Sequence, residues 1–204
     1  MQDFDRIYAE VGPKTVKKLH KAYGKLFKLE PREEVREDGS DPRGELLFAY
    51  QLAVGSVFDK PGGADVLRAA LKQGHLKRWP EARALFVEGL GQRVEADNIR
   101  LIAGYLEDDD VLVVRAAAGC LGLFSEADVK ARREAVAPLI KVLVSLESAA
   151  KKEAKKGKRE DAQEFLLSVE GTFLDALLPL TRQRFDSAEG WADWFKKNGS
   201  GEDW

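Results

Sequence analysis

The sequence predicts an all-helical protein. Apolar residues recur with helical spacing along most of the 204 residues, and no stretch shows the strict alternation of a half-buried strand. Hydrophobic residues make up 44% and charged residues 33%, and a chain of this length can bury a substantial core without a disulfide or a metal. The strongest helical pattern lies between Glu107 and Leu143, and the other expected elements are arranged around it.

The composition removes several classes of function. A single cysteine, Cys120, excludes an intrachain disulfide and a cysteine-based metal cluster, and two histidines make a histidine-rich metal site implausible. We therefore expect no metal and no cofactor. A formal net charge of −2 predicts no bulk attraction to nucleic acid or to an anionic membrane. No apolar run approaches the ~20 residues of a membrane span, and residues 1–12 lack the apolar core of a signal peptide, so we expect a cytoplasmic protein.

Residues 1–44 are expected to form a basic amphipathic helix and a polar loop, after a short helical face over residues 4–11. The basic helix runs from Pro13 to about Leu29. Its apolar stripe consists of Val16, Leu19, Tyr23 and Leu26. The opposite side carries a lysine stripe, made of Lys14, Lys18, Lys21, Lys25 and Lys28. At about 100° per residue these lysines stay within a strip roughly 80° wide.

The lysine stripe has two interpretations. It is either a surface that faces an anion, such as a phosphate, an acidic protein or a membrane, or the solvated face of a packed helix. The following loop, Glu30–Asp41, is rich in acids that are available to neutralise the stripe. The loop therefore favours the solvated face.

Three helices are expected next, over Arg43–Phe58, Ala64–Lys72 and Glu81–Leu90. The last two form a degenerate helix pair. We expect Trp79, which precedes a proline, to be wedged between helices rather than to line a binding cage. His75 lies at a helix end beside lysines, where a surface or capping histidine is expected rather than a ligand.

The central helix pair is predicted over Ala96–Glu107 and Val111–Phe124. In the second helix, Val114, Ala118 and Leu121 share one face at i, i+4 and i+7. The structural positions of this segment are Asp110, Val114, Arg115, Ala118, Leu121 and Gly122. The aspartate precedes the helix, where a carboxylate caps free N–H groups, and the glycine fits the C-terminal boundary. The arginine is expected to make a hydrogen-bonded contact within or between repeats.

Two long helices and an aromatic tail complete the chain. Ser125 is placed to cap a helix over Val129–Leu146, with Glu126 and Asp128 in its first turn. The lysine-rich residues 149–160 either extend the helices or form an exposed connector. A partner helix over Asp161–Leu178 is expected to stop at the following proline.

The tail contains Trp191 and Trp194, which share one helical face. We expect these two tryptophans to close the last apolar surface. An exposed aromatic binding patch is the alternative.

The run Asp110, Val114-Arg115, Ala118, Leu121-Gly122 resembles the second helix of a HEAT repeat, and residues 136–143 resemble the first helix of the next repeat. The Trp-x-x-Trp-Phe-x-x-Asn ending resembles tails of bacterial HEAT-type proteins. The resemblance implies a right-handed α-solenoid of antiparallel helix pairs, about eight or nine helices in all. The repeat domain would span residues 45–204, with its clearest repeats over 96–178 and its tryptophan cap over 185–198.

The resemblance implies a non-catalytic scaffold or adaptor whose curved helical surface binds another protein. The alternative is an electrostatic binder of nucleic acid or another anionic partner through the Lys14–Lys28 stripe. A second alternative is a HEAT-like DNA glycosylase, because Trp79, Asp110 and Arg115 supply the residue types of such an enzyme, although no motif assigns them these roles. No nucleophile elbow or phosphate loop is present in the sequence, so the balance is against an enzyme.

Overall fold

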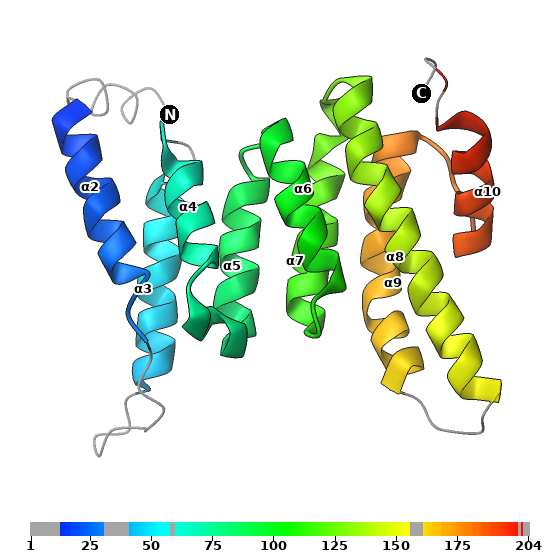
Figure 1. The fold of residues 1–204 in the computed structure, drawn as a ribbon, viewed down its shortest axis with the longest axis horizontal. Coiled ribbons are helices and arrows are strands. Elements are labelled where there is room, and N and C mark those ends of the chain that lie inside the picture. The colour runs from blue at the N-terminus through cyan, green and yellow to red at the C-terminus, as the bar shows by residue number, and fades with distance from the viewer. Residues whose placement is uncertain (1–12, 31–40, 58–59, 156–160, 200, 202–204) are drawn as a thin grey trace. The chain divides into compact units, whose positions relative to one another are not determined.

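The computed structural model describes residues 13–30, 41–57, 60–155, 161–199 and 201, without the side chains of residues 13–16 and Leu19. Within these ranges all regular structure is helical, with nine α-helices and three short 3-10 segments (Figure 1). The prediction of an all-helical protein is therefore confirmed for the described chain. The helical face predicted over residues 4–11, and most of the loop predicted after the basic helix, lie outside the described residues.

The chain forms two compact units, Met1–Ala82 and Arg83–Trp204. The α-helices are α2 (Pro13–Leu26), α3 (Pro42–Val57), α4 (Gly63–Leu71), α5 (Pro80–Gly91), α6 (Ala96–Gly104), α7 (Val111–Gly122), α8 (Val129–Lys155), α9 (Asp161–Thr181) and α10 (Ala188–Asn198). The 3-10 segments are η1 (Gly74–Arg78), η2 (Tyr105–Glu107) and η3 (Leu123–Glu126). The helix α2, which carries the lysine stripe, packs against α3 and α4 in the first unit.

Several helix boundaries differ from the sequence prediction. Helices α6 and α7 end at Gly104 and Gly122, and each is followed by a 3-10 segment. Helix α2 ends at Leu26 rather than near Leu29. Helix α8 passes through its internal proline and continues to Lys155, so the first part of the lysine-rich segment is helical. Helix α9 does not stop before Pro179 but runs to Thr181. Pro179 lies in the last turn of α9, where few helical hydrogen bonds remain to be lost. The helix therefore tolerates this proline.

Short acidic side chains determine where α7 and α8 begin. The Asp110 carboxylate accepts a hydrogen bond from the Leu112 N–H at 2.9 Å, which is an N-cap. For α8 the Asp128 carboxylate accepts from the Ala131 N–H at 2.8 Å. The cap predicted at Ser125 is wrong, because the chain forms the additional 3-10 segment η3 after α7 and delays the start of α8.

Three aromatic rings form the centre of the first unit. The Tyr50 ring lies 5.4 Å from the Phe27 ring of the segment that follows α2 and 5.4 Å from the Trp79 ring that precedes α5. All three side chains are buried, so Trp79 is enclosed as predicted. Tyr50 of α3 thus contacts one ring just after α2 and one just before α5. These contacts help to position α2 beside α4.

Small residues let α7 approach its neighbours closely in the second unit. A Cβ placed on Gly91 of α5 would lie 2.2 Å from the Cys120 sulfur, and one on Gly122 would lie 3.0 Å from the Ala176 Cα of α9. Cys120 is buried, as predicted, and burial raises the pKa of its thiol to about 12. Helix α7 is therefore held between α5 and α9 by contacts that leave no room for an added methyl group.

Helix α8 supplies carboxylates to the starts of the next two helices. Glu153 accepts a hydrogen bond from the Ala162 N–H at 2.9 Å, and Glu147 accepts one from the Ala188 N–H at 2.7 Å. These bonds satisfy free N–H groups at the first turns of α9 and α10. Helices α8 and α9 run antiparallel, and α10 packs on α8 (Figure 1).

The C-terminal helix closes the second unit with an aromatic cluster. The Phe185 ring lies 4.9 Å from the Trp191 ring, and the Trp191 ring lies 6.3 Å from the Trp194 ring. Trp191 is 1% exposed, whereas Trp194 is half-buried. The first tryptophan therefore contributes most of the apolar contact between α10 and the rest of the unit.

Replacing Gly91 with alanine should destabilise the protein, because the added methyl group overlaps Cys120. Overpacking of this kind costs about 1–3 kcal/mol. Gly119→Ala is the matched control, because a Cβ there meets nothing within 4 Å, and alanine in a helix is favoured over glycine by about 1 kcal/mol. Urea unfolding should show opposite shifts for the two variants, and equal shifts would contradict the close contact.

Trp191→Ala should lower the free energy of unfolding by about 3–5 kcal/mol, the usual loss for a buried tryptophan. Trp194→Ala should lower it clearly less, because that side chain is already partly exposed to solvent. Thermal melts of the two single variants check the order. If both variants melt at the wild-type temperature, the aromatic pair does not hold α10, and the exposed-patch interpretation is favoured.

Candidate functional site

Four leucines on or beside α7 and α9 are exposed in the second unit. Leu112 and Leu123, on α7 and just after it, are 49% and 41% exposed, and Leu167 and Leu178 of α9 are 66% and 47% exposed. The other large apolar side chain exposed in the described part of this unit is Val94, in the turn before α6. We call the four leucines the leucine face.

The two helices that carry the leucine face run in the same direction. A cavity at the start of α7 is lined by Asp109 together with Asp161 and Phe165 from the start of α9. At the other end of α7, Gly122 lies against Ala176, late in α9. The starts and the ends of the two helices are therefore paired.

The spacing of the leucines places them in two pairs. Leu112 and Leu123 are eleven residues apart, as are Leu167 and Leu178. Eleven residues make about three turns and ~16 Å of helix, so each helix presents its two leucines on one side. Between them, Gly119 of α7 is exposed, and a Cβ there would meet nothing within 4 Å. The surface is thus low in the middle and raised by a leucine at each end.

Few charges interrupt the leucine face. On α7 the exposed residues are Leu112, Arg115 and Gly119, so Arg115 is the one exposed charge of that helix. No hydrogen bond or ion pair of its guanidinium is found within the described residues, although the sequence led us to expect a contact within or between repeats. Helix α9 exposes Glu164 and Asp175 beside its leucines. Both signs of charge therefore flank an apolar strip.

The other sequence-predicted structural positions lie in the packing around this face. Val114, Ala118 and Leu121 are all 0% exposed, and Gly122 makes the close contact with α9. The sequence analysis named these residues but not the leucine face. One signal could have identified it. Two leucines spaced by eleven residues, outside the buried face of the helix, occur in both segments.

Two of the three residues considered for a DNA glycosylase, Trp79 and Asp110, have structural contacts. Trp79 is 2% exposed, and the Arg43 guanidinium lies over its ring at 5.6 Å. The Asp110 carboxylate is occupied by the Leu112 N–H. The buried Trp79 ring is therefore not free to stack with a nucleic acid base.

The lysine stripe is solvated where the structure describes it. Lys18, Lys21, Lys25 and Lys28 are exposed, and the side chain of Lys14 lies outside the described residues. None of the four is joined by an ion pair to a residue in the described ranges. Among those residues, no helix is both long and apolar enough to cross a bilayer.

Glu30, the first acid of the loop, lies near Tyr50 and His75. Burial, together with the charge of Glu30, raises the pKa of Tyr50 to about 12. Burial lowers the pKa of His75, against the effect of Glu30. The acids expected between residues 31 and 40 lie outside the described residues, so their neutralisation of the stripe stays a prediction.

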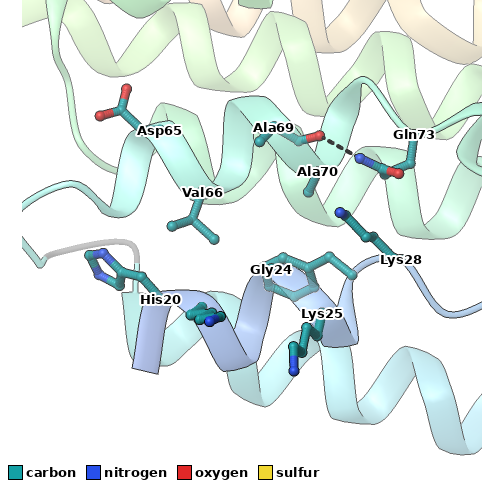
Figure 2. A pocket seen from close by; sticks show the side chains of 11 residues that line it. His20, Gly24, Lys25, Lys28, Asp65, Val66, Ala69, Ala70 and Gln73 are labelled. Carbon is teal, nitrogen blue, oxygen red and sulfur yellow. Dashed lines mark hydrogen bonds between the residues drawn. The ribbon is translucent and has the colours of Figure 1, made fainter. Parts of the chain in front are cut away.

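A groove of about 480 Å³ lies between α2 and α4, beside the lysine stripe (Figure 2). Its apolar wall comes from Gly24, Phe27, Val66, Ala69 and Ala70, and Lys21, Lys25 and Lys28 line its α2 edge. The sequence predicted the stripe but not the groove, because the two helices that form it are separated along the chain.

The Tyr50 hydroxyl fixes the end of α2 beside this groove. It donates a hydrogen bond to the Leu29 carbonyl at 2.6 Å and lies 3.5 Å from the His75 ring nitrogen Nε2. Because the pKa of Tyr50 is raised to about 12, the phenol remains a donor throughout the neutral and mildly alkaline range.

Tyr50→Phe should therefore loosen the end of α2 while keeping the aromatic core. We expect a loss of about 1 kcal/mol, the usual contribution of one hydrogen bond, and faster amide hydrogen exchange over residues 25–29. His75→Gln is the control, because it removes only the long contact to the phenol oxygen. Unchanged exchange in the Tyr50→Phe protein would show that the hydroxyl does not hold this segment.

The comparisons with known proteins give no further guide to these surfaces. No family model, no curated protein and no solved structure matches this chain. The case for a function therefore depends on the chemistry of the leucine face and of the α2–α4 groove.

Proposed function

We propose that this chain is a non-catalytic helical-repeat scaffold that binds another protein through its leucine face. The observation that carries the proposal is the set of four leucines, each more than 40% exposed, on two parallel and closely packed helices. Such side chains lose contact with water only when a partner covers them. Exposed apolar surface is typical of protein interaction sites.

The proposed architecture is a right-handed solenoid of the HEAT type. It is supported by the antiparallel pair α8 and α9, by the aspartate cap of α7, and by the small residues through which α7 contacts its neighbours. In a solenoid, the second helices of successive pairs line one surface, and α7 and α9 would be two such helices. This arrangement makes a binding surface from residues that are distant in sequence.

The partner that fits the leucine face is an amphipathic helix. Its apolar side chains would lie over Gly119, between leucines ~16 Å apart, the length of about three helical turns. Arg115 would attract an acid on one edge of the partner helix, and Glu164 and Asp175 would attract bases on the other. Most of the binding free energy would come from the buried leucines, since exposed ion pairs contribute little.

The combined substitution Leu167→Gln and Leu178→Gln should abolish partner binding without unfolding the protein. Both side chains are exposed, so the free energy of unfolding should change by less than about 1 kcal/mol. The test is quantitative affinity capture from the native source, followed by mass spectrometry. We expect a stoichiometric protein captured by the wild type to be lost in the double variant.

Leu29→Gln is the matched control, because Leu29 is 52% exposed and lies outside the leucine face. It should capture the same protein as the wild type, which separates specific binding from general adhesion of exposed leucines. Retention of every captured protein by the double variant would contradict the proposal. Analytical ultracentrifugation that shows a dimer of the wild type and a monomer of the double variant would also contradict it, because the leucine face would then join two copies of this chain.

A further inference from the structure

We infer that the groove between α2 and α4 binds a free, single-chain anionic amphiphile of the fatty-acid type. The alkyl chain would lie on the apolar wall and the carboxylate would lie at the lysines of α2. This inference concerns the Met1–Ala82 unit and is independent of the leucine face. It gives the lysine stripe a ligand of defined chemistry, in place of a general attraction to anions.

The wall of the groove selects for an alkyl chain. Gly24 and Phe27 face the groove from the α2 side, and Val66, Ala69 and Ala70 face it from α4 (Figure 2). A Cβ on Gly24 would meet nothing within 4 Å, so the glycine leaves the groove open. The volume of about 480 Å³ lies in the range of small-molecule sites, which are mostly apolar with a few polar groups.

The polar groups of the groove select for an anion at one edge. Lys21, Lys25 and Lys28 are exposed along the α2 edge and have no ion-pair partner within the described residues. On the α4 side, the Asp65 carboxylate is already paired with Arg68 at 2.9 Å. The Gln73 amide donates to the Ala69 carbonyl at 3.1 Å, as the dashed line in Figure 2 shows. The lysines, together with His20, whose buried Nε2 has no hydrogen-bond partner among the described residues, are therefore the polar groups left to bind a ligand.

The combination distinguishes an amphiphile from the other anions considered for the stripe. A nucleic acid would use the lysines but would leave the apolar wall without a partner. A single alkyl chain with a carboxylate fills both requirements at once. The lysines and the apolar wall line the same groove, so a short ligand can reach both.

The binding test uses dodecanoate below its micellar concentration and isothermal titration calorimetry on the full chain. We expect saturation at one equivalent. Dodecyltrimethylammonium, which has the same alkyl chain and the opposite charge, should bind at least about tenfold more weakly, and inorganic phosphate should not bind. Equal affinity for the cationic amphiphile would overturn the inference, as would binding to anionic phospholipid vesicles but not to free dodecanoate.

Filling the groove supplies the decisive variant. Gly24→Leu places a side chain in the open space and should reduce dodecanoate affinity by at least about tenfold. The fold should be retained, because leucine is favoured over glycine in a helix. Gly24→Ala is the control, since a methyl group leaves most of the volume open, and Ala69→Leu fills the groove from α4 in case Gly24→Leu perturbs α2. Unchanged affinity in both filling variants, with unchanged melting temperatures, would overturn the inference.

The contribution of the lysines to binding is tested separately from that of the groove volume. Lys21→Gln with Lys28→Gln should weaken dodecanoate about threefold to tenfold, the range for two exposed ion pairs. Lys17→Gln with Lys18→Gln removes the same charge from exposed positions of α2 that do not line the groove, and should have little effect. Equal losses in the two double variants would show a diffuse electrostatic attraction and contradict a built site.

Discussion

The close approach of α7 to α5 and α9 is the constraint on which the Arg83–Trp204 unit depends. Where Gly91 meets Cys120 and Gly122 meets Ala176, the sides of α7 admit small residues only. Large apolar side chains of α7 can then point in only two directions, inward to the core or outward to solvent. Val114 and Leu121 take the first direction and Leu112 takes the second. The exposed leucines therefore occupy positions where large side chains fit, although the packing of the core does not require them.

Features fixed by neighbouring residues could be predicted from the sequence. Helical periodicity gave the inner face of α7, and the position of Asp110 before an apolar run gave its cap. The errors occur where a distant contact or an additional turn decides the outcome. The segment η3 moved the cap of α8 from Ser125 to Asp128. Glu153 lies beyond the predicted end of α8, and its carboxylate accepts a hydrogen bond from the Ala162 N–H at the start of α9. No local sequence pattern shows this contact.

The two candidate sites differed in how far the sequence could reveal them. The lysines of α2 repeat at helical spacing, so one helix shows them all. The groove needs the opposite wall, Val66 and Ala69 on α4, and the open space at Gly24 that only the packed structure defines. The leucine face was missed for a different reason. Its residues are apolar, and the sequence alone does not show that these apolar side chains are exposed.

The formal net charge of −2 conceals a separation of charge along the chain. Helix α2 contains lysines and no acid, whereas α9 exposes Glu164 and Asp175. Exposed charges act over ~10 Å at 0.1 M salt, so each surface is governed by its own residues rather than by the net charge. Ligand binding at the groove should therefore weaken as salt rises, because the lysines contribute to it. Burial of the leucine face removes apolar area from water, an effect that salt screening does not reduce. The two surfaces can thus be distinguished in one protein, without any substitution, because salt screening weakens binding at the groove and not at the leucine face.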